Sequence, residues 1–158
     1  MTDRLVHSCE LEGRPVSVFE RSGMVPNPAL QMIPTPMVVE VFYECPAPDW
    51  PEARIRARRG VFRLLARLGH RPGVRLDEPE FNLGFRVDAA DEDFAIALLS
   101  PEMQRFMLEK RGVDWSVGNG RLRLYYRGRL RRGRMARSLD RFGRFWTYVP
   151  PELANWKE

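Results

Sequence analysis

Three residues in the first third of the chain carry side chains that zinc prefers as ligands. His7 and Cys9 lie two positions apart, so on a strand both point to the same side, where Cys45 could join them. Structural zinc sites have four ligands, and this set has three. Free cysteine is also among the residue types most often buried. We therefore expect these side chains to line an apolar strand face, and we predict no bound metal.

Groups suited to catalysis are sparse. A serine or cysteine triad would need His7 on a strand or His70 in the turn sequence GHRPG, and neither follows an elbow motif such as GxSxG. The trio Asp91, Glu92 and Asp93 suits acid–base work or Mg²⁺, but it equally suits the first turn of a helix, where the dipole favours anions. No Walker loop or GxGxxG is present. We expect no cofactor and, with a small hydrolase as the weaker alternative, no enzymatic activity.

The densest basic segment lies near the C-terminal end. Between Arg121 and Arg144 the chain has 10 arginines and a single acid, Asp140. At about 100° per residue, a helix there places four arginines in a stripe roughly 140° from an apolar stripe. Guanidinium groups near a helix start suit an anion. We predict a partner-binding surface here, the arginine rail, formed by Arg129, Arg131, Arg132, Arg134, Arg137, Arg141 and Arg144.

The arginine rail has an alternative interpretation as an ordinary solvated surface. The chain contains 24 Arg and 2 Lys, a skew that GC-rich codon usage also produces. Charge alternates along the chain: residues 1–51 carry a net −4, residues 52–75 +7, residues 76–114 −6 and residues 115–158 +8. The acidic block is then able to neutralise the rail within one molecule, and the sequence leaves both interpretations open.

Length and cysteine usage indicate the class of protein. The 158 residues suit one domain, in which residues 1–51 supply strands and a proline-rich loop. Two cysteines without a CxxC pair are typical of a reducing compartment. The longest apolar stretch, Met32–Tyr43, is too short to span a bilayer, and the N-terminus lacks the apolar core of a signal peptide. We expect a soluble, cytoplasmic protein.

Two β-hairpins are predicted with a defined register. A turn at Glu12-Gly13 pairs Cys9 with Val16 and His7 with Val18. Later in the chain, Asn119-Gly120 is the preferred dipeptide of a type I′ turn, because both positions need a positive φ. This second turn pairs Val117 with Leu122 and Trp115 with Leu124, and all four side chains lie on one face.

The remaining elements follow from periodicity and from proline. Residues 22–36 contain four prolines and are predicted as an irregular loop before a strand at 37–44, and residues 53–59 are ambiguous between strand and helix. Alternation of apolar residues predicts a strand at 81–87. The predicted helices are an amphipathic one at 61–68, one capped by Asp88, one capped by Ser100, and one from about Arg131 to Tyr148.

Residues 52–150 combine three motifs: F-N-x-x-F-x-V at 81–87, L-L-S-P at 98–101 and W-x-V followed by L-x-L at 115–124. This pattern resembles a domain of unknown function found in uncharacterised proteins of GC-rich bacteria. The resemblance implies an α+β domain and no particular activity, because the matching positions are strand-core residues, caps and turns.

These features together predict an α+β fold: an antiparallel, hairpin-built sheet with three or four helices packed on one face. A seven-strand half-barrel capped by the C-terminal helix is the alternative. The leading functional hypothesis is a non-enzymatic binding or regulatory domain that docks an acidic protein surface, or a second copy, through the arginine rail. Nucleic acid is the alternative partner, although the chain lacks a base-stacking motif.

Overall fold

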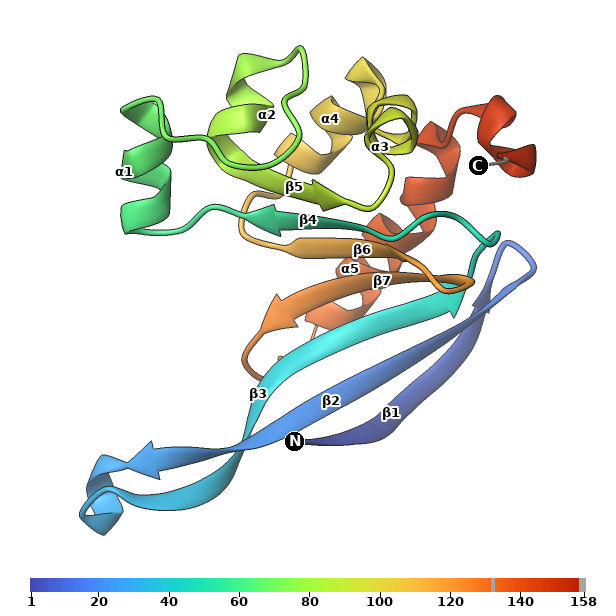
Figure 1. Cartoon of the computed structure of the whole chain (residues 1–158). Helices are drawn as coiled ribbons and strands as arrows, with labels where there is room; N and C mark the ends of the chain where they lie inside the picture. Colours follow the sequence, from blue (N-terminus) through green and yellow to red (C-terminus); the bar gives the residue numbers. More distant parts are fainter. Residues whose placement is uncertain (132, 157–158) are drawn as a thin grey trace.

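The protein is built on one seven-stranded antiparallel sheet. The computed structural model describes residues 1–131 and 133–156. The strand order across the sheet is β1-β2-β3-β7-β6-β4-β5 (Figure 1). The strands are β1 (Thr2–Leu11), β2 (Arg14–Asn27), β3 (Ile33–Pro46), β4 (Ala53–Ala57), β5 (Phe85–Ala89), β6 (Asp114–Gly118) and β7 (Arg121–Arg127). The predicted α+β class is confirmed, and residues 53–59 contribute a strand.

The helices are short and lie mostly against one face of the sheet. They are α1 (Val61–Arg67), α2 (Pro79–Gly84), α3 (Glu92–Leu98), α4 (Pro101–Leu108) and α5 (Arg134–Arg144), with 3-10 turns η1 (Pro28–Leu30), η2 (Phe145–Tyr148) and η3 (Pro151–Asn155). In Figure 1, α5 lies behind the central strands, α2 to α4 lie above β5, and α1 projects at one end. Within the described residues, no helix is long and apolar enough to cross a membrane.

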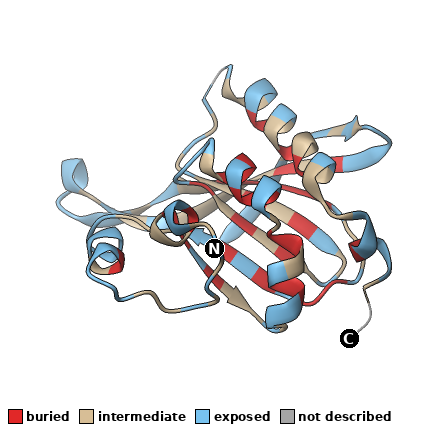
Figure 2. Cartoon of the chain, turned by 90° about the horizontal axis from the view of Figure 1, so that it is seen from above, coloured by how far each residue is buried: buried red, intermediate tan, exposed pale blue. Residues whose placement is uncertain are grey.

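The core lies between the sheet and these helices. Trp115 of β6 stacks on Phe145 of η2 at 5.0 Å between ring centroids, and Phe142 of α5 contacts both Trp115 and Tyr43 of β3. Buried residues gather along this interface (Figure 2). Successive strand residues point to opposite sides, so the other face of the sheet carries mostly polar side chains around a cluster of Phe19, Phe42 and Tyr125.

Both predicted hairpin registers are confirmed. Cys9 lies opposite Val16 in the β1–β2 pair, and Trp115 lies opposite Leu124 in the β6–β7 pair. At the second turn the φ angles are 53° for Asn119 and 68° for Gly120, as a type I′ turn requires.

The proline-rich segment at 22–36 is not an irregular loop, which corrects the prediction. Strands β2 and β3 continue through it, paired out to Asn27 opposite Ile33, and only η1 makes the turn. This two-stranded arm extends beyond both neighbouring strands, since β1 pairs β2 only as far as Ser22 and β7 pairs β3 only from Glu40 (Figure 1). Proline is tolerated here because the arm has two free edges.

The predicted strand at 81–87 is half wrong. Residues 79–84 form α2, led by Pro79 at its first turn, and only Phe85 onward is strand. Phe81 and Phe85 are four apart, a spacing that also suits a helix, and their rings stack at 4.8 Å. The helix cap was also misplaced: Asp91, not Asp88, accepts the Phe94 N–H at 2.9 Å, and Asp88 lies in β5. Ser100 caps α4 as predicted.

Candidate anion-binding site

The arginine rail is shorter than predicted. Helix α5 begins at Arg134 and ends at Arg144, so the predicted start near Arg131 is three residues early. Gly133, with a φ of 75°, sets the chain direction just before the helix. Arg129 and Arg131 are exposed and precede α5, and Arg132 lies outside the described residues.

Arg144 is not part of a solvent-facing stripe. Its guanidinium donates to the Glu109 carboxylate at 3.1 and 3.3 Å and to the Tyr148 hydroxyl at 3.3 Å. It also lies over the Phe106 ring, 5.4 Å from the centroid. The hydrogen bonds to Tyr148 and Glu109 raise the pKa of Arg144. Arg144 is therefore neutralised by an acid of the 76–114 block, as the alternative interpretation expects for the whole rail. The ion pair joins α5 to the end of α4.

The other rail arginines of α5 line a concave site with segments far away in sequence. We call this site the basic cleft, and its volume is about 400 Å³. No acidic residue is among its described lining: Arg59, Lys110, Arg111, Gly112, Val113, Tyr126, Arg127, Arg134, Arg137, Ser138 and Arg141. Seven basic residues therefore line one cavity, an arrangement that favours an anion.

Two of the cleft's cations have protein partners. Arg59 donates to the Gly112 carbonyl at 2.6 Å and to Asp114 at 3.3 Å, and Arg111 pairs with Glu80 at 2.9 Å. The ion pairs formed among residues 1–131 and 133–156 involve none of the other five, which are Lys110, Arg127, Arg134, Arg137 and Arg141. An anion that entered the cleft would reduce their mutual repulsion.

Sequence reasoning found the α5 side of this cleft and missed the rest. Lys110 and Arg111 fall in the acidic block at 76–114, Arg59 falls in the basic block at 52–75, and Arg127 precedes the predicted rail. The signal was present as charge, but nothing local indicates that residues 59, 110, 127 and 137 meet. Only the pairing of β3, β7 and β6 and the packing of α5 across them bring these residues together.

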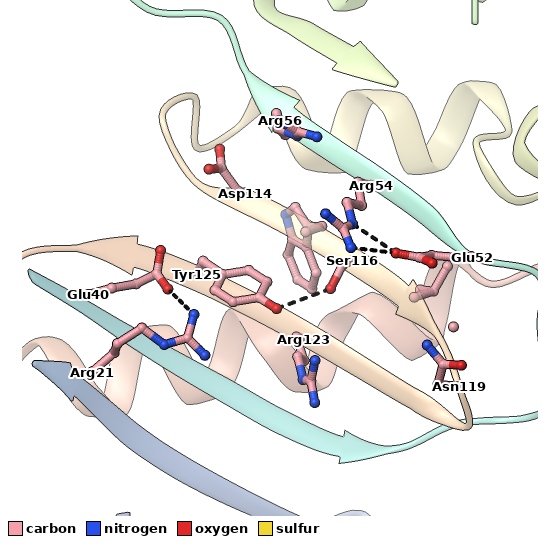
Figure 3. Close-up of a pocket in the computed structure, with 13 residues that line it drawn as sticks. Arg21, Glu40, Glu52, Arg54, Arg56, Asp114, Ser116, Asn119, Arg123 and Tyr125 are labelled. Atoms are coloured by element: carbon pink, nitrogen blue, oxygen red, sulfur yellow. Dashed lines mark hydrogen bonds and ion pairs between the residues drawn. The ribbon is translucent and has the colours of Figure 1, made fainter. Parts of the chain in front are cut away.

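A second hollow, of about 390 Å³, lies on the polar face of the sheet (Figure 3). Its cations are largely neutralised by neighbouring acids: Arg21 pairs with Glu40 at 3.1 Å, and Arg54 pairs with Glu52 at 2.7 Å. Tyr125 contacts the Ser116 hydroxyl at 3.4 Å. The charges here are balanced within the sheet, so this hollow is a weaker anion site than the basic cleft.

Arg21, which lines this hollow, contacts two acids whose pKa values shift in opposite directions: Glu40 in the hollow and Asp3 outside its lining. Burial raises the pKa of Glu40, although Arg21 beside it acts in the other direction. Hydrogen bonding from Arg21 at 2.7 and 3.0 Å lowers the pKa of Asp3. Arg21 therefore pairs with both carboxylates, but it stabilises the charged form of Asp3 more than that of Glu40.

The residues singled out for metal or catalysis do not converge. Cys9 pairs across from Val16, whereas Cys45 pairs across from Leu122 two strands further into the sheet. Burial raises the pKa of the Cys45 thiol to about 11, so it is a poor ligand and nucleophile at neutral pH. Within the part of the chain that the structure describes, no three His, Cys, Asp or Glu residues are grouped to hold a metal. His70 lies beside α1, and Asp91 is a helix cap.

Comparisons of the chain with protein-family models, with curated proteins and with solved structures found no match. Function is therefore inferred from the residues and geometry of the chain itself.

Proposed function

We propose that this protein is a non-enzymatic binding domain that docks an acidic protein surface in the basic cleft. The observation that carries the proposal is the concentration of seven cations around one cavity without an acidic lining residue. Carboxylates of a partner form bidentate hydrogen bonds with guanidinium groups, and such pairs are stronger in a concave site than on an open surface.

An acidic protein fits this cleft better than nucleic acid does. Nucleic-acid binding through α5 needs an extended row of arginines and exposed aromatic rings for stacking. The row is broken, because Arg144 is bound to Glu109. Tyr126, half-buried, is the one aromatic residue among the described lining of the cleft, and the nearby Trp115, Phe142 and Phe145 are at most 2% exposed.

The test measures binding of a fluorescent polyglutamate peptide to the whole protein. The variant Arg134→Gln, Arg137→Gln, Arg141→Gln should bind at least about tenfold more weakly, since each charge-assisted bond contributes on the order of 1.5–3 kcal/mol. A matched control, Arg63→Gln, Arg67→Gln, Arg75→Gln, removes the same charge from exposed positions outside the cleft and should bind normally. If both variants bound the peptide equally weakly, the binding would depend on the overall charge of the protein and not on the cleft, which would contradict the proposal.

Random DNA and RNA provide the competing outcome. Binding to about four phosphates would fall roughly fifty- to two-hundredfold between about 50 and 200 mM salt. Tight nucleic-acid binding with that salt dependence, lost in the cleft variant, would identify nucleic acid as the partner and overturn the protein proposal.

A further inference from the structure

The apolar side of α1 is uncovered, contrary to what its sequence indicates. Val61, Leu64 and Leu68 recur at the spacing of one helix face, which in a globular protein normally packs on the core. Here these three side chains are 60%, 54% and 76% exposed, and Phe62 beside them is 66% exposed. We call these four residues the apolar ridge. A contiguous exposed apolar group of this kind marks an interaction surface.

The helix contacts the rest of the domain from its other side. Ala66 is fully buried, and Arg71 donates to its carbonyl at 2.8 Å. Arg58, just before the helix, donates to the carbonyls of Asn82 and Phe85 at 3.1 and 3.0 Å. The apolar ridge therefore lies on the side of α1 that faces away from these contacts.

The ridge is bordered by positive charge. Residues 53–76 contain eight arginines and no acidic residue. Arg63 and Arg67 of α1 and Arg75 after it are exposed and take no part in the ion pairs of the described chain. On the Phe62 side, a cavity of about 330 Å³ is lined by five further arginines and the acid Asp114. Three of these arginines are ion-paired, Arg56 and Arg86 with Asp88 and Arg59 with Asp114.

We propose that α1 docks this protein on the surface of an anionic lipid bilayer. The four ridge side chains enter the boundary between headgroups and acyl chains, and Arg63, Arg67 and Arg75 bind the lipid phosphates. A helix with apolar residues on one side and arginine on the flank is the usual interfacial arrangement, and basic residues beside such a helix attract acidic lipids.

An anionic bilayer matches both the apolar ridge and the arginines beside it, whereas other binding partners match only one of the two. An acidic protein surface pairs with the arginines but leaves Val61, Leu64 and Leu68 beside polar groups. A second copy buries the ridges against each other but brings two arginine clusters together, which is repulsive. The proposal goes beyond the basic cleft, because the ridge and its flanking arginines Arg63, Arg67 and Arg75 are not among the cleft residues.

Co-sedimentation of the whole protein with large vesicles tests this proposal. The protein should bind vesicles of phosphatidylcholine with one-third phosphatidylglycerol and should not bind pure phosphatidylcholine. The variant Val61→Ser, Leu64→Ser, Leu68→Ser should bind the anionic vesicles at least about tenfold more weakly, because each lost apolar side chain removes part of the transfer free energy. Its melting temperature should equal that of the parent, since the three side chains are exposed.

Two controls separate this proposal from simpler explanations. Ile96→Ser removes a side chain that is 47% exposed on α3 and should leave vesicle binding unchanged. The cleft variant Arg134→Gln, Arg137→Gln, Arg141→Gln should also retain most vesicle binding while losing the polyglutamate peptide. The two proposals therefore fail in different assays.

Four results would overturn the bilayer proposal. The parent protein fails to bind the anionic vesicles, or the serine variant binds them as well as the parent, which makes the contact electrostatic only. The cleft variant loses the vesicles while the serine variant keeps them, which makes lipid a ligand of the basic cleft. Without vesicles, the parent sediments as a dimer and the serine variant as a monomer, which makes the occupant of the ridge a second copy.

Discussion

Arg144 of α5 and Glu109 at the end of α4 form a two-pronged ion pair, with guanidinium nitrogens 3.1 and 3.3 Å from the two carboxylate oxygens. The pair joins α5 to the acidic block at 76–114, which precedes α5 in the sequence. It also divides the predicted arginine rail into a structural arginine and a group of cations directed at the basic cleft.

Arg144→Gln should lower stability slightly, whereas Arg137→Gln should not. The side chains of Arg144 and Glu109 are both partly exposed, so their coupling should be below about 1 kcal/mol. Arg137 is exposed and forms no ion pair within the described residues. A double-mutant cycle with Glu109→Gln, followed by urea unfolding, measures this coupling. A coupling indistinguishable from zero would show that the pair makes no net contribution.

The glycines at the two ends of the β6–β7 turn should differ in their tolerance of a side chain. Both have a positive φ, 131° at Gly118 and 68° at Gly120. A Cβ at Gly118 would lie 2.8 Å from the Glu52 Cα, but one at Gly120 would meet nothing nearer than 3.8 Å. Gly120→Ala should therefore cost about 1–2 kcal/mol of backbone strain, and Gly118→Ala should cost clearly more. Thermal unfolding of the two variants gives the order, and the reverse order would contradict the turn geometry.

Sequence patterns predicted the hairpins because their information is local. Asn119-Gly120 determines its own turn, and the alternation from Trp115 to Leu124 determines the register. The prediction of a strand at 81–87 failed because the same pattern of residues allows two structures. Phe81 and Phe85 satisfy both strand alternation and helix spacing, and the choice is made by Pro79 and by the hydrogen bonds of Asn82. The basic cleft and the exposure of α1 depend on tertiary packing, which no local pattern encodes.

Asn82 should be essential to the local structure of its motif. Its side-chain oxygen accepts the Leu76 N–H at 3.0 Å, and its amide donates to the carbonyls of Leu76 and Glu78 at 2.5 and 3.2 Å. Asn82→Ala leaves these partly buried backbone groups without partners, so it should destabilise the protein by about 1–3 kcal/mol. Asn27→Ala removes a single bond at the exposed arm tip and is the matched control. Equal effects of the two substitutions in chemical denaturation would contradict this assignment.

The two cysteines should differ in reactivity and in their effect on alkaline stability. Cys45 is 1% exposed and Cys9 is partly exposed, so a thiol reagent at pH 8 should modify Cys9 rapidly and Cys45 only on unfolding. Burial raises the pKa of Cys45 from 9.0 to about 11. The unfolded thiol therefore ionises before the folded one, and stability should fall as pH rises from about 9 to about 11.

Cys45→Ala isolates this contribution. The alkaline loss of stability should be smaller in that variant than in the parent, although the raised pKa of buried Tyr43 leaves a further loss at higher pH in both. Rapid modification of both thiols in the folded protein would show that Cys45 is accessible.

The β2–β3 arm should be dispensable for folding. Residues 22–39 contain no charged side chain, and none of them belongs to the buried core. Gly23 lies opposite Met37, so residues 24–36 are replaceable by Asn-Gly, which closes the shortened hairpin with a type I′ turn. A shorter loop also costs less closure entropy, so the melting temperature should stay within a few degrees of the parent or rise.

Strand β2 supplies the control for this shortening. Val18 lies on the same strand but is fully buried, so Val18→Ala should lower stability by about 1–3 kcal/mol. If the shortened arm is as destabilising as Val18→Ala, the arm packs on something that stabilises the domain, and a second copy is the first candidate. Sedimentation of the parent and the shortened protein then decides, because an arm that joins two copies is lost together with the dimer. If the shortened protein keeps both its stability and its oligomeric state, the arm's exposed methionines and prolines are not needed by the fold.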